Sequence, residues 1–375
     1  MDVDVLIAGA GFAGAVMAER LAEGWGLSCL VVDRRAHVGG NAYDERAASG
    51  LRVHRYGPHW FHTGSARVQG YLSRFTAWQP AAYRVMSFAR GRYWPFPINL
   101  ATFEQLAGRR ATPGEMRDAL ERWRVPVARP RNSEEAVLAQ VGPALFRLFY
   151  EGYTRKQWGT EARALDASVC ARIPVRTDRT TAWFDEPFQA LPRDGYAALF
   201  ERLLRHPRIR VELKADLRAV RAAVRARHLV YTGMIDELYD FRFGRLPYRS
   251  LRFERETLAQ ERFQPVVQVN YPGDEPWTRI VEYKHVTGEA AGAPVTTIVR
   301  EHPEAHVAGR DPYYPMPTAA ARAQYARYAE LAAAEREVTF VGRLATYRYF
   351  NMDQVVGQAL AKADALGPRL AARAA

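Results

Sequence analysis

The hydrophobic positions at the start of the chain are spaced first as a buried strand, then as a helix, then as a second strand. Residues 3–8 (VDVLIA) and 27–33 (LSCLVVD) are short apolar runs, whereas 15–24 (AVMAERLAEG) has apolar side chains at helical spacing. We expect this helix to end near Gly24 and Gly26. The pattern predicts the strand–turn–helix–strand unit that begins a doubly wound α/β domain.

Further along, the pattern is first helical and then strand-like. Apolar positions recur at helical spacing through residues 113–165, and Ser133 followed by two glutamates is a typical helix start. Between 209 and 300, alternating apolar and polar positions predict strands of an antiparallel sheet with one solvated face. These strands are IRVEL (209–213), HLVYTG (228–233), YRSLRFERE (248–256), VVQVNYP (266–272), TRIVEYKHV (278–286) and VTTIVRE (295–301).

The C-terminal part returns to alternating helix and strand. Residues 318–336 and 351–366 have helical periodicity, and 338–342 (VTFVG) reads as a buried strand. We expect residues 367–375 to form a loose tail. No internal repeat and no low-complexity linker interrupts the sequence.

Composition and charge narrow the classes of function. The 375 residues carry 53 lysines and arginines against 41 acidic residues, a net charge of +12, but nearly all the excess is arginine and it is scattered. This distribution argues against nucleic-acid binding and favours a phosphate-bearing small molecule, which guanidinium groups bind bidentately. Cys29 and Cys170 cannot make a disulfide framework, and Cys29 should be a buried, inert thiol. No signal peptide, membrane insertion or metal site is expected, and we expect a cytoplasmic protein.

A dinucleotide-binding motif lies directly after the first strand. Gly9, Gly11 and Gly14 form G-x-G-x-x-G, which permits a tight turn, close approach of a pyrophosphate and close helix–strand packing. Asp33 ends the second strand, where a ribose partner is expected. The string HVGGNAY (37–43) adds a second glycine pair that favours FAD over NAD.

Longer strings give the chain a resemblance to a known family. In order, these are HVGGNAY (37–43), YGPHWFHTGS (56–65), EGYTRKQWG (151–159), RIPVR (172–176), YTGMIDELYDFRFGRLPYRSLRFE (231–254), TRIVEYKH (278–285), DPYYPM (311–316) and GRLATYRYFNMDQV (342–355). Together they resemble UDP-galactopyranose mutase of the prokaryotic type, over nearly the whole chain. This flavoenzyme family interconverts the six- and five-membered ring forms of UDP-galactose, the latter being UDP-galactofuranose.

The resemblance implies an architecture. It predicts a discontinuous Rossmann-like FAD-binding domain with an inserted helical bundle and an antiparallel β-sheet domain, and a substrate cleft between them. The implied FAD domain covers 1–75, 195–235 and 315–375; the helical bundle covers 100–170; the sheet domain covers 76–99, 171–194 and 236–314, with a mobile loop at 166–190. It also implies a homodimer.

The implied reaction is an isomerisation of a UDP-sugar by covalent catalysis through N5 of reduced FAD, with NADPH or NADH as the reductant. The implied catalytic residues are Arg172 and Arg279, which clamp the diphosphate, with His59 and His62 beside the flavin. Further expected cofactor-binding residues are Gly9, Gly11, Phe12, Gly14, Asp33, Gly40, Asn41, Trp60, Arg343 and Met352. Expected substrate-binding residues, besides the two clamp arginines, are Tyr83, Phe149, Tyr153, Thr154, Trp158, Trp183, Arg249, Asn270, Tyr314, Tyr349 and Asn351.

The sequence departs from the family pattern near the implied substrate. Asn351 stands where aspartate is usual, Trp183 where a phosphate-contacting tyrosine is usual, and Tyr83 where asparagine is expected. Pro58 replaces a small residue in the histidine loop. We therefore hypothesise that the flavin chemistry is retained and that the sugar differs from galactose.

Other readings remain open on the residues alone. A mutase acting on another nucleotide sugar in specialised metabolism would keep every flavin motif. An amine-oxidase-type or desaturase flavoprotein shares the glycine signatures but lacks the paired diphosphate arginines. A carrier that no longer holds flavin would have little use for an intact glycine motif.

Overall fold

The structure is a computed structural model that describes residues 2–287 and 292–372. Its first layer is a five-stranded parallel sheet in the order β10 (Ile209–Leu213), β2 (Cys29–Asp33), β1 (Asp2–Ala8), β11 (Arg225–Tyr231) and β17 (Val338–Phe340). Because successive side chains of a strand point to opposite faces, each strand contributes side chains to two hydrophobic cores, one on each face of the sheet. On one face, Val5 and Ile7 pack with helices α1 (Phe12–Trp25) and α13 (Met352–Ala371); on the other, Leu6 packs towards α9 (Leu217–Ala223).

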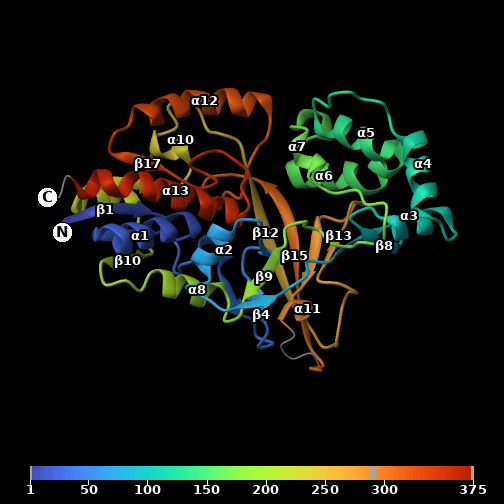
Figure 1. Ribbon diagram of the computed structural model, residues 1–375, viewed down its shortest axis with the longest axis horizontal. Helices are drawn as coiled ribbons and strands as arrows, with labels where there is room; N and C mark the ends of the chain where they lie inside the picture. The colour runs from blue at the N-terminus through green and yellow to red at the C-terminus, as the bar shows by residue number, and fades with distance from the viewer. Residues whose placement is uncertain (1, 288–291, 373–375) are drawn as a thin grey trace.

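A seven-stranded sheet forms the centre of the molecule (Figure 1). Its order is β16 (Tyr314–Pro315), β12 (Tyr248–Leu258), β15 (Thr296–Ala305), β14 (Arg279–Glu282), β13 (Gln268–Asn270), β7 (Val85–Ala89) and β8 (Arg92–Phe96). Every pair is antiparallel except β13 with β7. The antiparallel sheet expected from the alternating pattern is therefore confirmed, with one parallel pair inside it.

A cluster of helices lies beyond one end of this sheet, at the upper right of Figure 1. It comprises α3 (Leu100–Ala107), α4 (Pro113–Trp123), α5 (Ser133–Leu145), the π-helix η2 (Phe146–Glu151), α6 (Gly152–Trp158) and α7 (Ser168–Ala171), with a 3-10 turn η3 (Ala162–Ala164). The chain kinks at Gly142 inside α5, and the π-helix that follows carries Phe149 and leads directly into α6. After this kink and bulge, η2 contacts β7 and α6 contacts β15 of the sheet.

The remaining elements connect these layers. Two small sheets consist of β3 (Asp44–Arg46) with β4 (Arg52–His54), and of β5 (Phe61–Thr63), β9 (Phe188–Pro192) and β6 (Trp78–Pro80). The other helices are η1 (Gly40–Ala42), α2 (Ala66–Leu72), α8 (Tyr196–Leu203), α10 (Ile235–Leu238), α11 (Lys284–Thr287) and α12 (Ala319–Ala334). Within the described residues, no helix is long and apolar enough to cross a membrane.

Three expectations from the sequence pattern need correction. Residues 209–213 and 228–231 join the parallel sheet, because β10 pairs with β2 and β11 with β1. The strand expected to run to residue 286 stops at Glu282, and α11 follows. The tail is not loose up to residue 371: α13 continues to Ala371 because Leu370 is buried against the core. Residues 373–375 lie outside the described part.

Candidate active site

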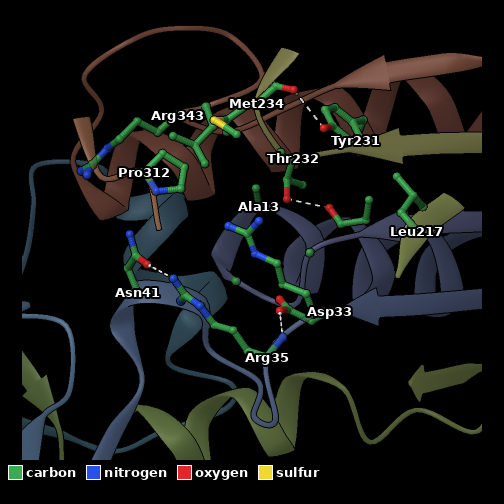
Figure 2. Close-up of a pocket in the computed structure, with 18 of the residues that line it drawn as sticks. Ala13, Asp33, Arg35, Asn41, Leu217, Tyr231, Thr232, Met234, Pro312 and Arg343 are labelled. Atoms are coloured by element: carbon green, nitrogen blue, oxygen red, sulfur yellow. Dashed lines mark hydrogen bonds between the residues drawn. The ribbon is translucent and has the colours of Figure 1, made fainter. Parts of the chain in front are cut away.

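A cavity of about 600 Å³ runs along the carboxyl ends of the parallel strands. Figure 2 shows its lining, with Asp33, Thr232 and Leu217 on one side and Asn41, Pro312 and Arg343 on the other. Open α/β sheets bind ligands at this edge. Of the expected cofactor residues, Gly9, Gly11, Phe12, Asp33, Gly40, Asn41, His59, Arg343 and Met352 line this cavity.

The glycine motif fits a dinucleotide closely. A Cβ built at Gly14 would lie 1.9 Å from the carbonyl oxygen of Gly9, and Gly9 itself has φ +105°. Gly14 therefore lies behind the cavity wall and provides the close packing of α1. A Cβ at Gly40 would lie 3.0 Å from Cα of Gly11, so two bare backbones meet where a pyrophosphate would approach. No side chain caps the α1 N-terminus, which leaves its N–H groups for an anion.

Two backbone donors hold the carboxylate of Asp33 at the lining of this cavity. The N–H of Ala10 donates to Oδ2 of Asp33, and the N–H of Arg35 donates to Oδ1, both at 2.8 Å. The Arg35 guanidinium then donates from Nη2 to Oδ1 of Asn41 at 2.8 Å (Figure 2). The same Nη2 donates to Oδ2 of Asp311, again at 2.8 Å. Arg35 was not among the expected site residues; its signal is its position two residues past the ribose acid.

A second cavity, of about 620 Å³, adjoins the first. The two cavities are neighbours that share a common wall. Five residues line both cavities and form this wall: Asn41, His59, Tyr313, Arg343 and Met352. The second cavity is bounded by the seven-stranded sheet, the η2–α6 segment and the 172–186 segment. A flavin ring reaching past the common wall would face a ligand in the second cavity.

Both arginines expected to clamp a diphosphate line the second cavity. Nη2 of Arg279 lies 2.7 Å from Oε2 of Glu301, whose side chain is fully buried. Arg172 comes from the loop after α7, and its guanidinium carbon lies 4.3 Å from the ring centroid of Tyr349. Two guanidinium groups from distant segments therefore converge on one space, as a doubly charged anion requires.

Tyr349 lies among positive charges. Tyr349 is 38% exposed and is only partly desolvated in the cavity. Desolvation by itself would raise its pKa, but the charges of Arg172, Arg343 and Arg279 outweigh that effect and lower the pKa to about 8. The Tyr349 ring stacks on Tyr314 with centroids 5.5 Å apart. Both hydroxyls therefore belong to the arginine-rich side of the cavity, where a phosphate would lie.

His59, at the common wall, is held in one tautomer. Its Nδ1 lies 2.8 Å from the carbonyl oxygen of Gly57, which can only accept, so Nδ1 carries the proton and Nε2 is free to accept. Burial, with the neighbouring His54 and arginines, lowers the pKa of His59 to about 3, so the ring is neutral. His62 lines the second cavity, with Nδ1 3.1 Å from Oε1 of Glu186 and its ring stacked on Phe184.

Aromatic side chains form the rest of the second cavity. Phe149 and Tyr153 come from adjacent turns of the η2–α6 segment, and Thr154 follows them. All four residues that depart from the family pattern also line this cavity: Pro58, Tyr83, Trp183 and Asn351. Trp60 lines it as well, rather than the first cavity. Gln268, which no sequence motif marked, also lines this cavity and is buried.

Two expected substrate residues lie outside the cavity lining. Trp158 is buried, with its ring centroid 6.0 Å from that of Tyr314, and therefore packs behind the wall. Arg249 is also buried; its Nε donates to the carbonyl oxygen of Gln157 at 3.0 Å and its Nη2 to that of Lys156 at 3.2 Å. The structure places Arg249 where it ties β12 to the end of α6.

The two cysteines are buried, as expected for Cys29. Burial, with a smaller contribution from Asp4, raises the pKa of the Cys29 thiol to about 12. Such a thiol is inert at neutral pH. Within the described residues, no group of three or more histidine, cysteine or acidic side chains is arranged to hold a metal ion.

A cavity with a dinucleotide motif that shares a wall with an arginine-lined cavity fits a flavoenzyme with a phosphorylated substrate. Comparison with known proteins defines the family. A family model described as UDP-galactopyranose mutase matches residues 148–349, and one described as an NAD(P)-binding Rossmann-like domain matches residues 7–75. The dTDP-fucopyranose mutase of Escherichia coli is 36% identical over 366 residues, covering 95% of this chain and 96% of that protein.

A probable UDP-galactopyranose mutase of Klebsiella pneumoniae is also 36% identical, covering 96% of this chain and 94% of that protein. Among solved structures, reduced UDP-galactopyranose mutase matches with a TM-score of 0.76 at 16% identity, over 98% of this chain and 99% of that one. Putrescine oxidase shares the fold with a TM-score of 0.61 at 13% identity. The chain belongs to the UDP-galactopyranose mutase family. It is an isomerase with FAD as its cofactor.

Proposed function

We propose that this enzyme interconverts the pyranose and furanose forms of a nucleoside-diphosphate sugar, which binds in the second cavity. The observation that carries the proposal is the convergence of Arg172 and Arg279 on a space separated from the FAD cavity only by the wall that includes His59 and Arg343. A sugar whose diphosphate met both arginines would have its anomeric carbon near the flavin end of that wall.

FAD, when bound and reduced, supplies a nucleophilic nitrogen for the anomeric carbon. The chain must then hold the departing diphosphate and keep it ready to return. Arg172 and Arg279 neutralise the charge that develops as the anomeric bond breaks. The hydroxyls of Tyr314 and Tyr349, with the amide of Asn270, donate hydrogen bonds without adding charge, so they bind the leaving group without trapping it.

Neutral His59 is suited to the cofactor side of the wall. Its free Nε2 offers a hydrogen-bond acceptor, and its uncharged ring adds no charge beside the isoalloxazine. Phe149 and Tyr153 offer apolar faces on which a pyrimidine base can stack. These aromatic walls also exclude water, which protects an opened sugar from side reactions.

The residues of the second cavity that depart from the family pattern bear on the identity of the sugar. Tyr83, Trp183 and Asn351 give this cavity a bulkier and less acidic lining than the family pattern has. We propose a substrate that is UDP-galactose or a close relative, and these residues favour a relative that differs at the sugar. The Escherichia coli relative, named for dTDP-fucopyranose, and the Klebsiella relative, named for UDP-galactopyranose, are equally similar to this chain.

A competition between nucleotide sugars tests this assignment. Reduced enzyme would be offered the furanose forms of UDP-galactose and dTDP-fucose separately, and kcat/KM compared by chromatography of the products. A higher kcat/KM for the deoxy sugar supports a changed sugar site. A clear preference for UDP-galactofuranose would make the three departures tolerated variations of an ordinary galactose site.

We further propose that NADPH or NADH reduces the bound FAD, and that the enzyme works in the cytoplasm as a homodimer. These three points rest on the family alone. Anaerobic bleaching of the flavin absorbance by each nucleotide tests the reductant, and light scattering on a sizing column tests the dimer. A monomer at micromolar concentration, or a flavin that only dithionite reduces, would overturn the respective point.

A further inference from the structure

Three strands of the central sheet align a row of polar side chains under the second cavity. Asn270 on β13 pairs with Arg279 on β14, and Arg279 pairs with Glu301 on β15. Directly paired residues of antiparallel strands lie on the same face, with their Cβ atoms about 4.5–5.5 Å apart. The amide of Asn270 is therefore a neighbour of the Arg279 guanidinium, and both line the cavity.

This placement raises a problem of amide orientation. An asparagine amide beside a cation is most stable with its carbonyl oxygen turned towards the positive charge. In that orientation Oδ1 of Asn270 would partly neutralise Arg279, and the Nδ2 donors would turn away from it. A site that binds an anion needs the reverse, with the donors of Asn270 and Arg279 both offered to the ligand.

A buried chain of hydrogen bonds fixes the reverse orientation. Nε2 of Gln268 donates to Oδ1 of Asn270 at 2.8 Å, and the hydroxyl of Tyr83 donates to Oε1 of Gln268. Gln268 and Asn270 are two residues apart on β13, so they share a face. All three side chains are at least 93% buried. With Oδ1 occupied, no partner for Nδ2 of Asn270 is found within the described ranges 2–287 and 292–372.

Tyr83 is the first donor in this chain of hydrogen bonds. Burial raises the pKa of the Tyr83 hydroxyl, so that it stays protonated and can donate. In the structure this hydroxyl donates to Oε1 of Gln268, and Nε2 of Gln268 is then the group that faces Asn270. The Tyr83 ring is fixed in place by Trp60, at 4.8 Å between centroids, and by a stacked Phe184, at 5.7 Å.

We propose that Tyr83 and Gln268 are positioning residues, which orient the amide of Asn270 so that its donors, with Arg279, bind the diphosphate of the substrate. The proposal rests on the proposed function, since it assigns the phosphate to this side of the second cavity. It gives a physical role to one residue at which this sequence departs from the family pattern. It also assigns a role to Gln268, a buried residue with no other evident function.

The test is a double-mutant cycle on UDP binding to the FAD-loaded, full-length protein, measured by calorimetry. Tyr83→Phe keeps the ring and removes only the donor. It should raise the dissociation constant for UDP by about threefold to tenfold. Asn270→Ala should raise the dissociation constant at least as much. In the Asn270→Ala background, Tyr83→Phe should add less than about twofold, because the residue it orients is gone.

Two controls separate positioning from general damage. Tyr328→Phe removes a hydroxyl that donates to the carbonyl oxygen of Gly244 at 2.7 Å in a separate core, and should leave UDP affinity unchanged. Gln268→Met removes both links at nearly constant volume and should match Tyr83→Phe. An equal loss from Tyr83→Phe in both backgrounds, or no loss in either, would overturn the proposal.

A crystallographic comparison tests the relay without any nucleotide. In the free wild-type protein, Oδ1 of Asn270 should face Gln268; in Tyr83→Phe, the Asn270 side chain should turn towards Arg279. An unchanged Asn270 in that variant would contradict the relay. Wild-type protein that binds neither UDP nor dTDP, with the relay geometry intact, would contradict the proposed function instead.

Discussion

Arg279 and Glu301 form an ion pair in which the carboxylate has no exposure to solvent. Nη2 of Arg279 lies 2.7 Å from Oε2 of Glu301, and no hydrogen-bond donor other than Arg279 reaches this carboxylate in the described residues. Burial raises the pKa of Glu301, and the charge of Arg279 opposes that shift. The pair holds the guanidinium at the floor of the cavity.

Removing the carboxylate should therefore be costly for the fold. We expect Glu301→Ala to lower the free energy of unfolding by about 3–5 kcal/mol, because a largely buried guanidinium is left without its partner. Denaturant unfolding of the FAD-loaded protein measures this. The double variant Arg279→Met/Glu301→Leu should recover most of the loss while losing UDP binding. A Glu301→Ala protein as stable as wild type would show that the ion pair does not contribute this much to the free energy of unfolding.

The close packing of Gly14 predicts a sharp effect on cofactor retention. A Cβ at this position meets the backbone oxygen of Gly9 at 1.9 Å, which no side-chain adjustment can relieve. We expect Gly14→Ala to be purified with less than about a tenth of the normal flavin, because the turn that would hold the pyrophosphate must shift. The ratio of flavin to protein absorbance measures the effect.

Gly24, on the same helix, is the matched control. A Cβ there meets nothing within 4 Å. Gly24→Ala should therefore retain full flavin and be slightly more stable, by up to about 1 kcal/mol, since alanine is the better helix former. Equal flavin loss in both variants would attribute the defect to the helix rather than to the turn.

The titration of Tyr349 predicts a pH dependence of nucleotide binding. Its pKa is lowered to about 8 in the free enzyme, so the phenolate forms as the pH rises through 8. A phenolate repels a diphosphate and can no longer donate to it, so UDP affinity should fall as the pH rises from 7 to 9. Binding near pH 8 should also take up a proton, which calorimetry in buffers of different ionisation enthalpy detects.

Tyr349→Phe isolates this group. The variant should bind UDP more weakly at pH 7, and its affinity should change less between pH 7 and 9. If wild type and variant show the same pH profile, another group titrates in this range. The remaining arginines keep their charge throughout, so they contribute no slope.

Features set by neighbouring residues could be predicted from the sequence, whereas features set by long-range strand pairing could not. The first strand and the glycine turn with α1 could be predicted because each depends on neighbouring residues, and the structure confirms both. It also places Asp33 at the end of β2, beside the glycine turn. The strands at 209–213 and 228–231 were placed in the wrong kind of sheet, because their pairing with β2 and β1 is set far away in the chain.

The site shows the same division. Motif strings selected Arg172, Arg279 and Asn270, and the structure brings all three to one cavity. Glu301 and Gln268 carried no signal, because their importance arises only from the register of β13, β14 and β15. Trp158 and Arg249 lie inside strongly matching strings, yet they pack behind the cavity wall. A matching string therefore did not distinguish residues that line the cavity from residues that support its wall.

The most direct test of the central claim is conversion by the reduced enzyme. Purified, FAD-loaded protein would be reduced with dithionite under anaerobic conditions, incubated with UDP-galactofuranose or dTDP-fucofuranose, and the products separated by chromatography. We expect conversion of at least one furanose to its pyranose, with no net oxidation of the sugar and no conversion by the oxidised enzyme. A reducible, flavin-loaded protein that converts neither sugar, or that consumes oxygen with an amine substrate, would contradict it.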